Sequence, residues 1–425
     1  MERFIIQGGN VLSGSITAQG NKNEALPALA ACLLTDEPMI LHNVPRIGDV
    51  FIMLDILRSL GADVEELGPN SYKVCCAGVQ SAEIDRDKAK SLRAAILLAG
   101  PLITRFDKVI LPPPGGDVIG RRRLDDHILA LQRLGASVSD NNRDFLFSRQ
   151  NLKGNDIFLE EQSVTATENA LMAAVLSRGK TSVRNAACEP HVVGLTTLLR
   201  KMGANISGSG TNRLDIQGVE GLKGTEHTIG PDLLEIGGYM VLAAVTKSKI
   251  SIHGANADEL QVIRSTYGKL GISYTLEDGV IHMSNQGLKV KRDFAGDIPK
   301  IDDGSWPAFP TDLMSILIVA ATQTEGTVLF FEKMYDGRMF FVDHLIGMGA
   351  RIVLCDPHRV VVVGPSQLYG THVTSPDIRA GMALVIAALC AEGESVLYNI
   401  KQIDRGYENL EGKLQSLGAN IIRMS

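Results

Sequence analysis

Three basic residues lie at or just before the start of long apolar segments: Lys22, Arg93 and Arg379. The segments ALPALAACLL, LRAAILLAGPLI and AGMALVIAALC are apolar nearly all round, which is typical of helices buried in the centre of a domain. A helix N-terminus offers N–H groups and the positive end of the macrodipole, so a cation placed there favours binding of an anion such as phosphate or carboxylate. For any one of the three, a surface position is the ordinary alternative.

Two aspartates lie at the start of apolar segments as well. Asp312 opens DLMSILIVAA after a Pro-Thr turn, and Asp377 lies in PDIR, just before AGMALVIAALC. A carboxylate at a helix start accepts hydrogen bonds from the first backbone N–H groups. The sequence alone favours this capping role for both residues.

These segments belong to a unit that occurs six times along the chain. Its signature resembles L-x-x-L-G-A-x-V/I and occurs as LRSLGADV, LQRLGASV, LRKMGANI, YGKLGISY, LIGMGARI and LQSLGANI. Each copy is interpreted as a buried helix, a β-branched strand, an amphipathic helix ended by the glycine, and two short strands. The signature glycines, 68 to 78 residues apart, are Gly61, Gly135, Gly203, Gly271, Gly349 and Gly418.

The last copy ends at GANIIRMS, one strand short, and the N-terminal ERFIIQGG resembles the missing strand. We therefore expect the two ends of the chain to meet in one domain. Two groups of three copies predict an α/β fold with one domain at residues 22–230 and a second built from residues 1–21 plus 231–425. Two chain crossings close together would suit a hinge beside a ligand-binding cleft.

One copy contains an insertion. From the start of the buried helix to the glycine, copies one, three and four need 36 residues, whereas copy two needs 43. The additional residues fall in PPPGGDVIGRRR, which carries Asp117 and three consecutive arginines. An irregular, glycine-bearing insertion on a regular scaffold predicts a functional lid at residues 112–123 of the first domain.

With these motifs the chain resembles the UDP-N-acetylglucosamine enolpyruvyl transferases, which are related to 5-enolpyruvylshikimate-3-phosphate synthase. The resemblance runs from Lys22 to Tyr407 and includes NKNEALP, PGGDVIGRRRLDDH, PAFPTD, PDIRAGMAL and IDRGYE. It implies a two-domain inside-out α/β barrel, with three βαβαββ repeats in each domain and an interdomain cleft. It also implies transfer of the enolpyruvyl group of phosphoenolpyruvate to a sugar hydroxyl by addition and elimination, without a metal or an organic cofactor.

Phosphoenolpyruvate carries a phosphate and a carboxylate on three carbons, so its binding requires several cations, and arginine is favoured for its bidentate geometry. A set of six basic residues at matching positions of a repeat is hard to explain as surface charge. The positions that by resemblance contact phosphoenolpyruvate are Lys22, Arg122 and Arg405, with Arg93, Arg338 and Arg379 nearby.

The resemblance gives the two helix-start aspartates additional roles that are compatible with capping. Asp312 is matched to the acceptor hydroxyl, as general base or orienting group. Asp377 is matched to stabilisation of the charged intermediate and to proton transfer. The positions that match the nucleotide-sugar site are Asn23, Asp125, Ser163, Val164, Asp312 and Tyr335.

Asp117 departs from the family pattern, because most members have a cysteine here that protonates the substrate methylene carbon or assists product release. A carboxylic acid can also deliver a proton. We expect Asp117 to be protonated mainly in the closed ternary complex, where bound phosphate and exclusion of water favour the neutral form. Fosfomycin alkylates the family's cysteine thiolate, and a carboxylate is a far weaker nucleophile, so we expect resistance to the drug.

Three further departures lie where the uracil should rest: Arg123 for a proline, Asp126 for an apolar residue and Thr165 for a glycine. Neutral substitution at the edge of the nucleotide-sugar site explains them more simply than a change of substrate. Two alternatives stay open. One is another acceptor, such as a UMP-like nucleotide or shikimate 3-phosphate, and the other is a paralogue that binds a UDP-sugar without turnover.

Composition argues against several other classes of protein. The net charge of −6 and the absence of a basic stripe argue against nucleic acid, and the apolar runs are too short to span a membrane. The N-terminus does not resemble a signal peptide, and six cysteines without CxxC or disulfide-scaffold spacing indicate a reducing cytoplasm. No Cys/His group has the spacing of metal ligands, and no obligate protein partner is indicated.

The sequence therefore predicts a cytoplasmic transferase. Its expected reaction is transfer of the enolpyruvyl group to the 3-hydroxyl of UDP-N-acetylglucosamine, the first committed step of peptidoglycan precursor synthesis, with consequences for the cell wall, cell shape and cell division.

Overall fold

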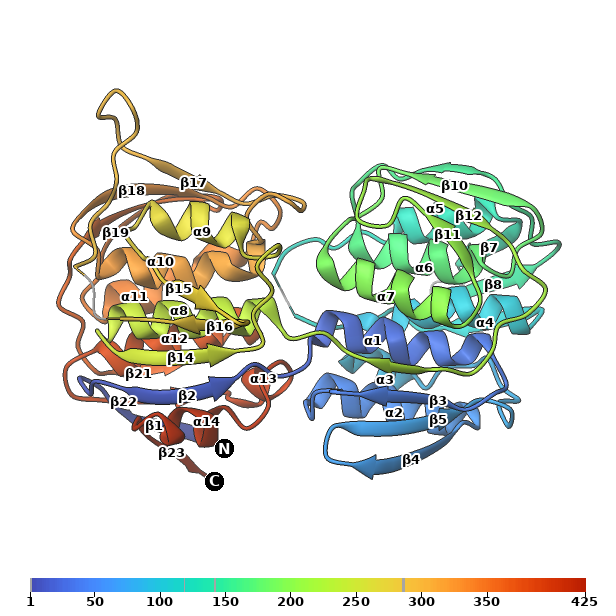
Figure 1. Cartoon of the computed structure of the whole chain (residues 1–425), viewed down its shortest axis with the longest axis horizontal. Helices are drawn as coiled ribbons and strands as arrows, with labels where there is room; N and C mark the ends of the chain where they lie inside the picture. The colour runs from blue at the N-terminus through green and yellow to red at the C-terminus, as the bar shows by residue number, and fades with distance from the viewer. Residues whose placement is uncertain (1, 118, 141–142, 285–286) are drawn as a thin grey trace. The chain divides into compact units, whose positions relative to one another are not determined.

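The computed structural model describes residues 2–117, 119–140, 143–284 and 287–425. The chain divides into two compact units, each with its own hydrophobic core (Figure 1). Unit 1 comprises residues 2–19, 119–121 and 231–425, and unit 2 comprises residues 20–117 and 122–230.

Both units are built from short strands that alternate with helices along the chain. In unit 2 the strands are β3 (Met39–His42), β4 (Asp63–Gly68), β5 (Ser71–Cys75), β6 (Lys108–Leu111), β7 (Ala136–Asp140), β8 (Phe145–Arg149), β9 (Asp156–Phe158), β10 (Lys180–Arg184), β11 (Asn205–Ser207), β12 (Arg213–Gln217) and β13 (Glu226–Thr228). In unit 1 they are β1 (Arg3–Gln7), β2 (Ser13–Thr17), β14 (Lys249–His253), β15 (Thr275–Glu277), β16 (Val280–His282), β17 (Lys300–Asp302), β18 (Gly326–Phe331), β19 (Arg351–Asp356), β20 (Arg359–Gly364), β21 (His372–Thr374), β22 (Glu394–Tyr398) and β23 (Asn420–Met424).

The sheets repeat one arrangement. In the order β13-β3-β5-β4, the edge strand β13 runs parallel to β3, and the other pairs are antiparallel. The same pattern occurs in β9-β10-β12-β11, β2-β14-β16-β15, β17-β18-β20-β19 and β21-β22-β1-β23. In β6-β8-β7, a parallel bridge between Glu83 and Ile110 stands in for the edge strand. This recurrence confirms the predicted sixfold repeat.

Helices pack between the sheets of each unit, and 3₁₀-helices are labelled η. In unit 2 they are α1 (Lys22–Ala31), η1 (Cys32–Leu34), α2 (Gly48–Leu60), α3 (Arg86–Ser91), η2 (Arg93–Leu98), α4 (Ala99–Arg105), α5 (Asp125–Arg133), α6 (Val164–Ala174) and α7 (Pro190–Lys201). In unit 1 they are α8 (Leu233–Val245), α9 (Gln261–Gly268), η3 (Thr311–Leu313), α10 (Met314–Thr322), η4 (Arg338–Phe341), α11 (Val342–Gly347), α12 (Ile378–Cys390), α13 (Lys401–Asp404) and α14 (Leu410–Ser416).

The apolar helices form the centre of each unit, as their sequences predict. In unit 1, α8, α10 and α12 pack against one another (Figure 1). Every residue of α8 and α10 is buried. In unit 2, α1, α4 and α6 occupy the corresponding places in the core. The segment LRAAILLAGPLI differs from the expected single helix, because it forms η2 and then α4. Pro101 has no N–H to donate to the carbonyl of Leu97, so a continuous α-helix would lose a hydrogen bond there.

The six signature glycines all have left-handed backbone conformations. Their φ angles lie between +78° and +108°, in the region that favours glycine where an amphipathic helix turns into the next strand. This confirms the prediction that each glycine ends a helix.

A structural asparagine recurs at the end of one strand in three copies. Asn43, Asn185 and Asn399 have φ angles of +55°, +55° and +58°. Each side-chain amide donates to the main-chain carbonyl just beyond the neighbouring parallel strand, at 2.9 Å (Ile229), 3.0 Å (Leu159) and 2.8 Å (Ser375). The residue therefore fixes both the left-handed turn and the end of the edge strand.

The two ends of the chain pair in one sheet. β1 lies between β22 and β23, antiparallel to both, with Arg3 opposite Tyr398 and Met424. The prediction that the N-terminal strand completes the last copy is therefore confirmed.

Candidate active site

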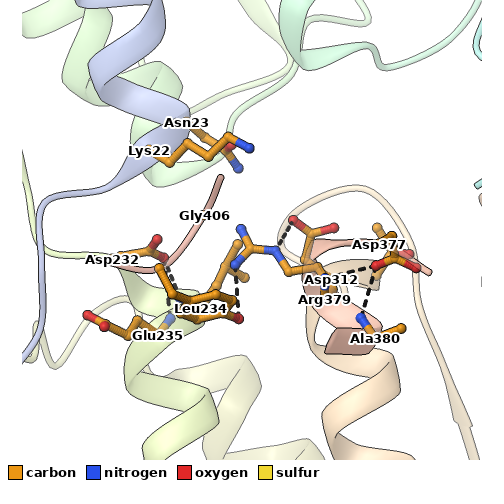
Figure 2. Close-up of polar contacts among 12 residues, drawn as sticks. Lys22, Asn23, Asp232, Leu234, Glu235, Asp312, Asp377, Arg379, Ala380 and Gly406 are labelled. Atoms are coloured by element: carbon orange, nitrogen blue, oxygen red, sulfur yellow. Dashed lines mark hydrogen bonds and ion pairs between the residues drawn. The ribbon is translucent and has the colours of Figure 1, made fainter. Parts of the chain in front are cut away.

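The most closely connected group of predicted site residues in unit 1 surrounds the carboxylate of Asp312. Arg338 Nη2 donates to Asp312 Oδ1 at 2.9 Å. Figure 2 shows the second bond, in which Arg379 Nε donates to Asp312 Oδ2 at 3.1 Å. Both arginines are buried, whereas about a quarter of the Asp312 side chain (27%) is exposed. The two guanidinium groups therefore hold a carboxylate that a ligand can reach.

Aromatic rings support both guanidinium groups. Arg379 Nη1 donates to the Tyr407 hydroxyl at 3.2 Å, and Arg379 Cζ lies 5.5 Å from the centre of the Tyr407 ring. Arg338 lies 5.2 Å from the centre of the Tyr335 ring. Burial raises the pKa of Tyr407 to about 12, so its hydroxyl stays protonated and accepts from Arg379. Stacking and hydrogen bonding restrict where each guanidinium group can point.

The two helix-start aspartates differ in what they contact. Asp377 caps α12, where its Oδ1 accepts from Arg379 N at 2.8 Å and from Ala380 N at 2.9 Å (Figure 2). Asp312 is the second residue of η3, which begins after Pro310 without a side-chain cap. The capping role that the sequence favours is therefore confirmed for Asp377, whereas Asp312 lies inside η3 and not at its cap position. The Pro-Thr turn displaces the cap position, and the carboxylate is bound by arginines from η4 and α12.

Arg405 directly follows the short helix α13. Its Nη1 donates to Gln402 Oε1 at 2.8 Å, within the same turn of chain. Asp404, the last residue of α13, is bound by both terminal nitrogens of Arg423 on β23, at 2.6 and 2.9 Å. The sheet edge thus fixes the end of the helix from which Arg405 projects.

In unit 2, Lys22 and Asn23 are the first two residues of α1. Asn21 caps the helix and accepts from Asn23 N at 2.8 Å. Lys22 is buried (9% exposed), and its Nζ lies 2.6 Å from Oδ2 of Asp49 at the start of α2. Asp49 was not among the sequence candidates, yet it fixes the ammonium group at the helix start.

The inserted loop approaches Arg93 closely. Arg93 Nη2 donates to the carbonyls of Arg122 at 2.8 Å and Arg123 at 3.2 Å. A Cβ on Gly115 would lie 1.6 Å from the carbonyl oxygen of Lys90, and one on Gly116, where φ is +112°, would lie 2.8 Å from Arg93 Cβ. These glycines let the chain pass against the end of α3 and the start of η2 immediately before Asp117. Residues 119–121 group with unit 1, where Gly337 N donates to the Ile119 carbonyl at 3.0 Å.

Arg123 and Asp126 make their contacts inside unit 2. Arg123 Nε lies 3.1 Å from Asp125 Oδ2, and Arg123 also faces Glu160 and Glu161 at 3.4 and 3.7 Å. The carboxylate of Asp126 accepts from the backbone N–H groups of Glu160 and Glu161 at 2.8 and 2.9 Å. Together they hold the segment that leads into α6, which Ser163 caps and Val164 begins.

Thr165 belongs to a buried polar chain with His127. Asn169 Nδ2 donates to His127 Nδ1 at 2.9 Å, and its amide orientation is fixed because its Oδ1 accepts from Gly100 N at 2.7 Å. The proton of the neutral ring therefore lies on Nε2, which donates to Thr165 Oγ1 at 3.0 Å. Burial, followed by the charge of Arg93, lowers the pKa of His127 to about 3. His127 is thus a neutral structural residue.

The predicted site residues fall in both units. Unit 2 contains Lys22, Asn23, Arg93, Asp117, Arg122, Asp125, Ser163 and Val164, and unit 1 contains Asp312, Tyr335, Arg338, Asp377, Arg379 and Arg405. Residues that sequence reasoning missed are Asp49, Tyr407 and the buried cap of α8, Asp232, whose pKa burial raises. Tyr407 lies within the IDRGYE motif and Asp232 within a second PD pair, so those patterns were signals that could have found them.

Two further observations limit the chemistry. Within residues 2–117, 119–140, 143–284 and 287–425, no group of three or more His, Cys, Asp or Glu side chains is arranged to hold a metal ion. In the same ranges, no helix has both the length and the apolar character needed to cross a bilayer.

Residues 6–414 match the model of the family described as EPSP synthase (3-phosphoshikimate 1-carboxyvinyltransferase). The chain is 54% identical over 422 residues to the UDP-N-acetylglucosamine 1-carboxyvinyltransferase of Treponema denticola, and 53% identical to that of Borreliella burgdorferi, with 99% of each chain covered. The chain therefore belongs to the EPSP synthase family.

Solved structures agree on the fold. The enolpyruvyl transferase NikO from Streptomyces tendae matches with a TM-score of 0.89 at 23% identity, covering 100% of this chain and 99% of that one. EPSP synthase from Acinetobacter baumannii matches with a TM-score of 0.78 at 18% identity, covering 100% of both chains. The architecture is thus that of the enolpyruvyl transferases.

Proposed function

We propose that this chain transfers the enolpyruvyl group of phosphoenolpyruvate to the 3-hydroxyl of UDP-N-acetylglucosamine and releases phosphate. Relatives with 54% and 53% identity over nearly the whole chain carry the name of that activity. The structural observation that carries the proposal is the Asp312 carboxylate, which two buried arginines hold while part of it stays accessible. Such a group is suited to orient a hydroxyl and take its proton.

In the addition step, the acceptor hydroxyl forms a C–O bond to the central carbon of phosphoenolpyruvate and gives its proton to Asp312. Asp117 delivers a proton to the terminal methylene carbon, which becomes a methyl group. Lys22, Arg122 and Arg405 bind the phosphate and carboxylate, with Arg93, Arg338 and Arg379 nearby. The product of this step is a tetrahedral ketal phosphate.

In the elimination step, the methyl carbon returns a proton to Asp117, the C–O bond to phosphate breaks, and the enol ether forms. Asp377 stabilises the positive charge that develops on the central carbon. Asn23, Asp125, Ser163, Val164 and Tyr335 line the site of the nucleotide sugar. The protein supplies acid, base and anion-binding groups, so the proposed reaction balances without a cofactor.

The proposed reaction belongs to peptidoglycan precursor synthesis, and we place it in the cytoplasm. The six cysteines lack the spacing of a disulfide scaffold, which suits a reducing compartment. The contacts of Arg123, Asp126 and Thr165 within unit 2 support the view that these departures stabilise the segment before α6 rather than change the acceptor.

The test is phosphate release from phosphoenolpyruvate with UDP-N-acetylglucosamine, UMP or shikimate 3-phosphate as acceptor. We expect turnover with the first, and a kcat/KM for the other two that is lower by about 10³-fold or more, because unpaired polar groups at the site penalise the wrong acceptor. Asp312→Asn should lower kcat about 10²- to 10⁴-fold, as expected for loss of a general base. Asp343→Asn, at an exposed carboxylate of α11, is the matched control.

A preference for UMP or shikimate 3-phosphate would replace the proposed acceptor. Binding of UDP-N-acetylglucosamine without release of phosphate would support a non-catalytic UDP-sugar-binding protein instead.

A further inference from the structure

Two buried carboxyl groups lie side by side in unit 1, and one of them is bonded to Thr311, the residue before Asp312. Asp303 follows β17 and Glu332 follows β18, and these parallel strands pair with Asp302 opposite Phe331, so the two acidic residues come next in register. Neither residue is exposed to solvent. Because paired strands lie about 4.8 Å apart, acidic side chains at these consecutive register positions adjoin each other.

The Glu332 carboxyl group accepts hydrogen bonds from two segments. One is Thr311, directly before Asp312, and the other is the loop that precedes Arg338. Thr311 Oγ1 donates to the two carboxyl oxygens of Glu332 at 2.8 and 3.0 Å. Glu332 Oε1 also accepts from the backbone N–H groups of Met334 at 3.0 Å and Tyr335 at 3.1 Å. The carboxyl group of Glu332 thus fixes the loop that carries Tyr335 and leads to η4, which begins at Arg338.

The hydrogen bonding of Asp303 indicates that one of the two carboxyl groups is protonated. Its Oδ1 accepts from Lys333 N at 2.6 Å, whereas its Oδ2 has no hydrogen-bond donor among the described residues. Two ionised carboxylates in contact without solvent would repel, and the cost of burying both charges is large. One proton on Glu332, donated to Asp303 Oδ2, satisfies the orphaned oxygen and removes the repulsion.

The other charged groups around Asp303 and Glu332 do not neutralise a second negative charge on the pair. From η4, Arg338 Nε lies 3.7 Å from Glu332 Oε2, but the same guanidinium group is bonded to Asp312. From the β19–β20 turn, His358 Nδ1 donates to the main-chain carbonyl of Glu332 at 2.8 Å. Lys333 points its Nζ at Asp302, 2.9 Å away. Arg338 is therefore shared between the carboxyl groups of Glu332 and Asp312.

We propose that Asp303 and Glu332 share one proton, and that this protonated pair positions Thr311, Tyr335 and Arg338 around Asp312 for binding of the acceptor. The inference rests on the proposed function, because it takes Asp312 as the group that meets the acceptor hydroxyl. Glu332 is a positioning residue, since it acts on the acceptor site through other residues.

Loss of the shared proton should loosen this arrangement in weakly alkaline solution. Burial and then the neighbouring Asp303 raise the pKa of Glu332 to about 8. Above that pH the pair carries two buried negative charges, which repel and displace the loop at residues 332–338. The acceptor Kd should therefore increase about tenfold between pH 7 and pH 9, one order of magnitude for each pH unit beyond the pKa.

The fluorescence of Trp306 can report the loss of the shared proton. Trp306 is the sole tryptophan and lies in the turn between Asp303 and Thr311, partly buried against the core of unit 1. We expect its fluorescence to titrate with a midpoint near pH 8 in the unmodified protein. This readout requires no substrate and no turnover.

The test combines this titration with calorimetric measurement of the UDP-N-acetylglucosamine Kd at pH 7, 8 and 9. Glu332→Gln retains a carbonyl that accepts from Thr311 and gains an amide that donates to Asp303, but it has no proton to lose. It should abolish the fluorescence transition and make the acceptor Kd independent of pH. Asp303→Asn removes the neighbouring charge, so the transition should move to lower pH. Glu325→Gln, at an exposed carboxylate directly before β18, is the matched control and should titrate like the unmodified protein.

A fluorescence transition that is absent from the unmodified protein, or that persists unchanged in Glu332→Gln, would overturn the inference. A transition lost in Glu332→Gln without any effect of pH on the acceptor Kd would overturn the positioning role. Failure of the proposed function looks different, since it gives no binding of UDP-N-acetylglucosamine at any pH with the fluorescence transition intact.

Discussion

At the scale of single residues, the orientation of Asp312 depends on two buried guanidinium groups with different supports. Arg379 is bonded to Asp312 and Tyr407 and lies at the start of α12, while Arg338 is bonded to Asp312 and stacks on Tyr335. Burial acts to lower the pKa of Arg379, but Tyr407, Asp312 and Asp232 raise it overall, so the residue stays charged. A fixed guanidinium group next to the proposed base therefore holds the Asp312 carboxylate in one orientation.

Arg379→Lys should therefore impair the reaction without removing the charge. A lysine cannot bond Asp312 and Tyr407 at the same time, so we expect kcat/KM to fall about 10²-fold, the size typical for loss of one placed electrostatic group. Steady-state kinetics with phosphoenolpyruvate and UDP-N-acetylglucosamine measure this. Arg359→Lys, at an exposed ion pair with Asp356, provides the control, and equal kinetics of the two variants would show that the geometry of Arg379 has no role.

Asp117 leads to a prediction about inhibition. Because a carboxylate is a poor nucleophile towards an epoxide, fosfomycin should not inactivate the unmodified protein in a time-dependent way. Asp117→Cys should become sensitive and should shift the limb of the pH–rate profile that Asp117 sets. Irreversible inactivation of the unmodified protein, or an identical pH limb in Asp117→Cys, would contradict the proposed role of Asp117.

At the scale of elements, the inserted loop packs against α3 and the start of η2 through glycines that no other residue could replace without a shift. Gly115 N donates to the Ala89 carbonyl at 3.0 Å, and its Cα faces the Lys90 carbonyl. Asp117 comes two residues later, so the path of the chain at Gly115 decides where the proposed acid lies.

Gly115→Ala should lower kcat about 10²-fold, the cost expected when a reacting group moves by about 1 Å. The melting temperature should change little, because the loop contributes few buried apolar contacts. Gly221→Ala, where a Cβ meets no atom within 4 Å, is the matched control. Unchanged kcat in Gly115→Ala would mean that the loop tolerates displacement.

Much of the scaffold follows from the sequence, because buried helices and signature glycines have strong local causes. The apolar helices lack a polar face, and the glycines take φ angles that L-residues avoid. Contacts that depend on distant segments were beyond this reasoning. Asp312 was expected to cap a helix, yet it is bonded to arginines 26 and 67 residues away, and Lys22 is paired with Asp49 on another helix. Asn43, Asn185 and Asn399 were also missed, although an asparagine after each strand was a visible signal.

At the scale of the whole molecule, two buried groups give stability opposite dependences on pH. The pKa of His127 is lowered from 6.5 to about 3, so below pH 6.5 the unfolded chain takes up a proton that the folded chain refuses, and stability falls with falling pH. The pKa of Glu332 is raised from 4.5 to about 8, so the folded chain keeps a proton that the unfolded chain loses, and this contribution to stability falls as pH rises.

The predicted loss of stability at low pH can be tested on unit 2, which contains His127. The free energy of unfolding should decrease by at most about 1.4 kcal/mol per pH unit between pH 6.5 and pH 4 through His127, the limit for one proton. Hydrogen exchange of α5 and α6 at several pH values measures this locally. His127→Gln should flatten the decline, whereas His282→Gln, on β16 of unit 1, should leave it unchanged. The same slope in His127→Gln and the unmodified protein would contradict the assignment.

The most direct test of the central claim is identification of the product. The protein is incubated with phosphoenolpyruvate and UDP-N-acetylglucosamine, the nucleotide sugar is analysed by mass spectrometry, and released phosphate is quantified in the same sample. We predict a nucleotide sugar heavier by one enolpyruvyl group and one phosphate released per product molecule. Phosphate release with an unchanged nucleotide sugar, or no reaction while phosphoenolpyruvate and another acceptor are converted, would contradict it.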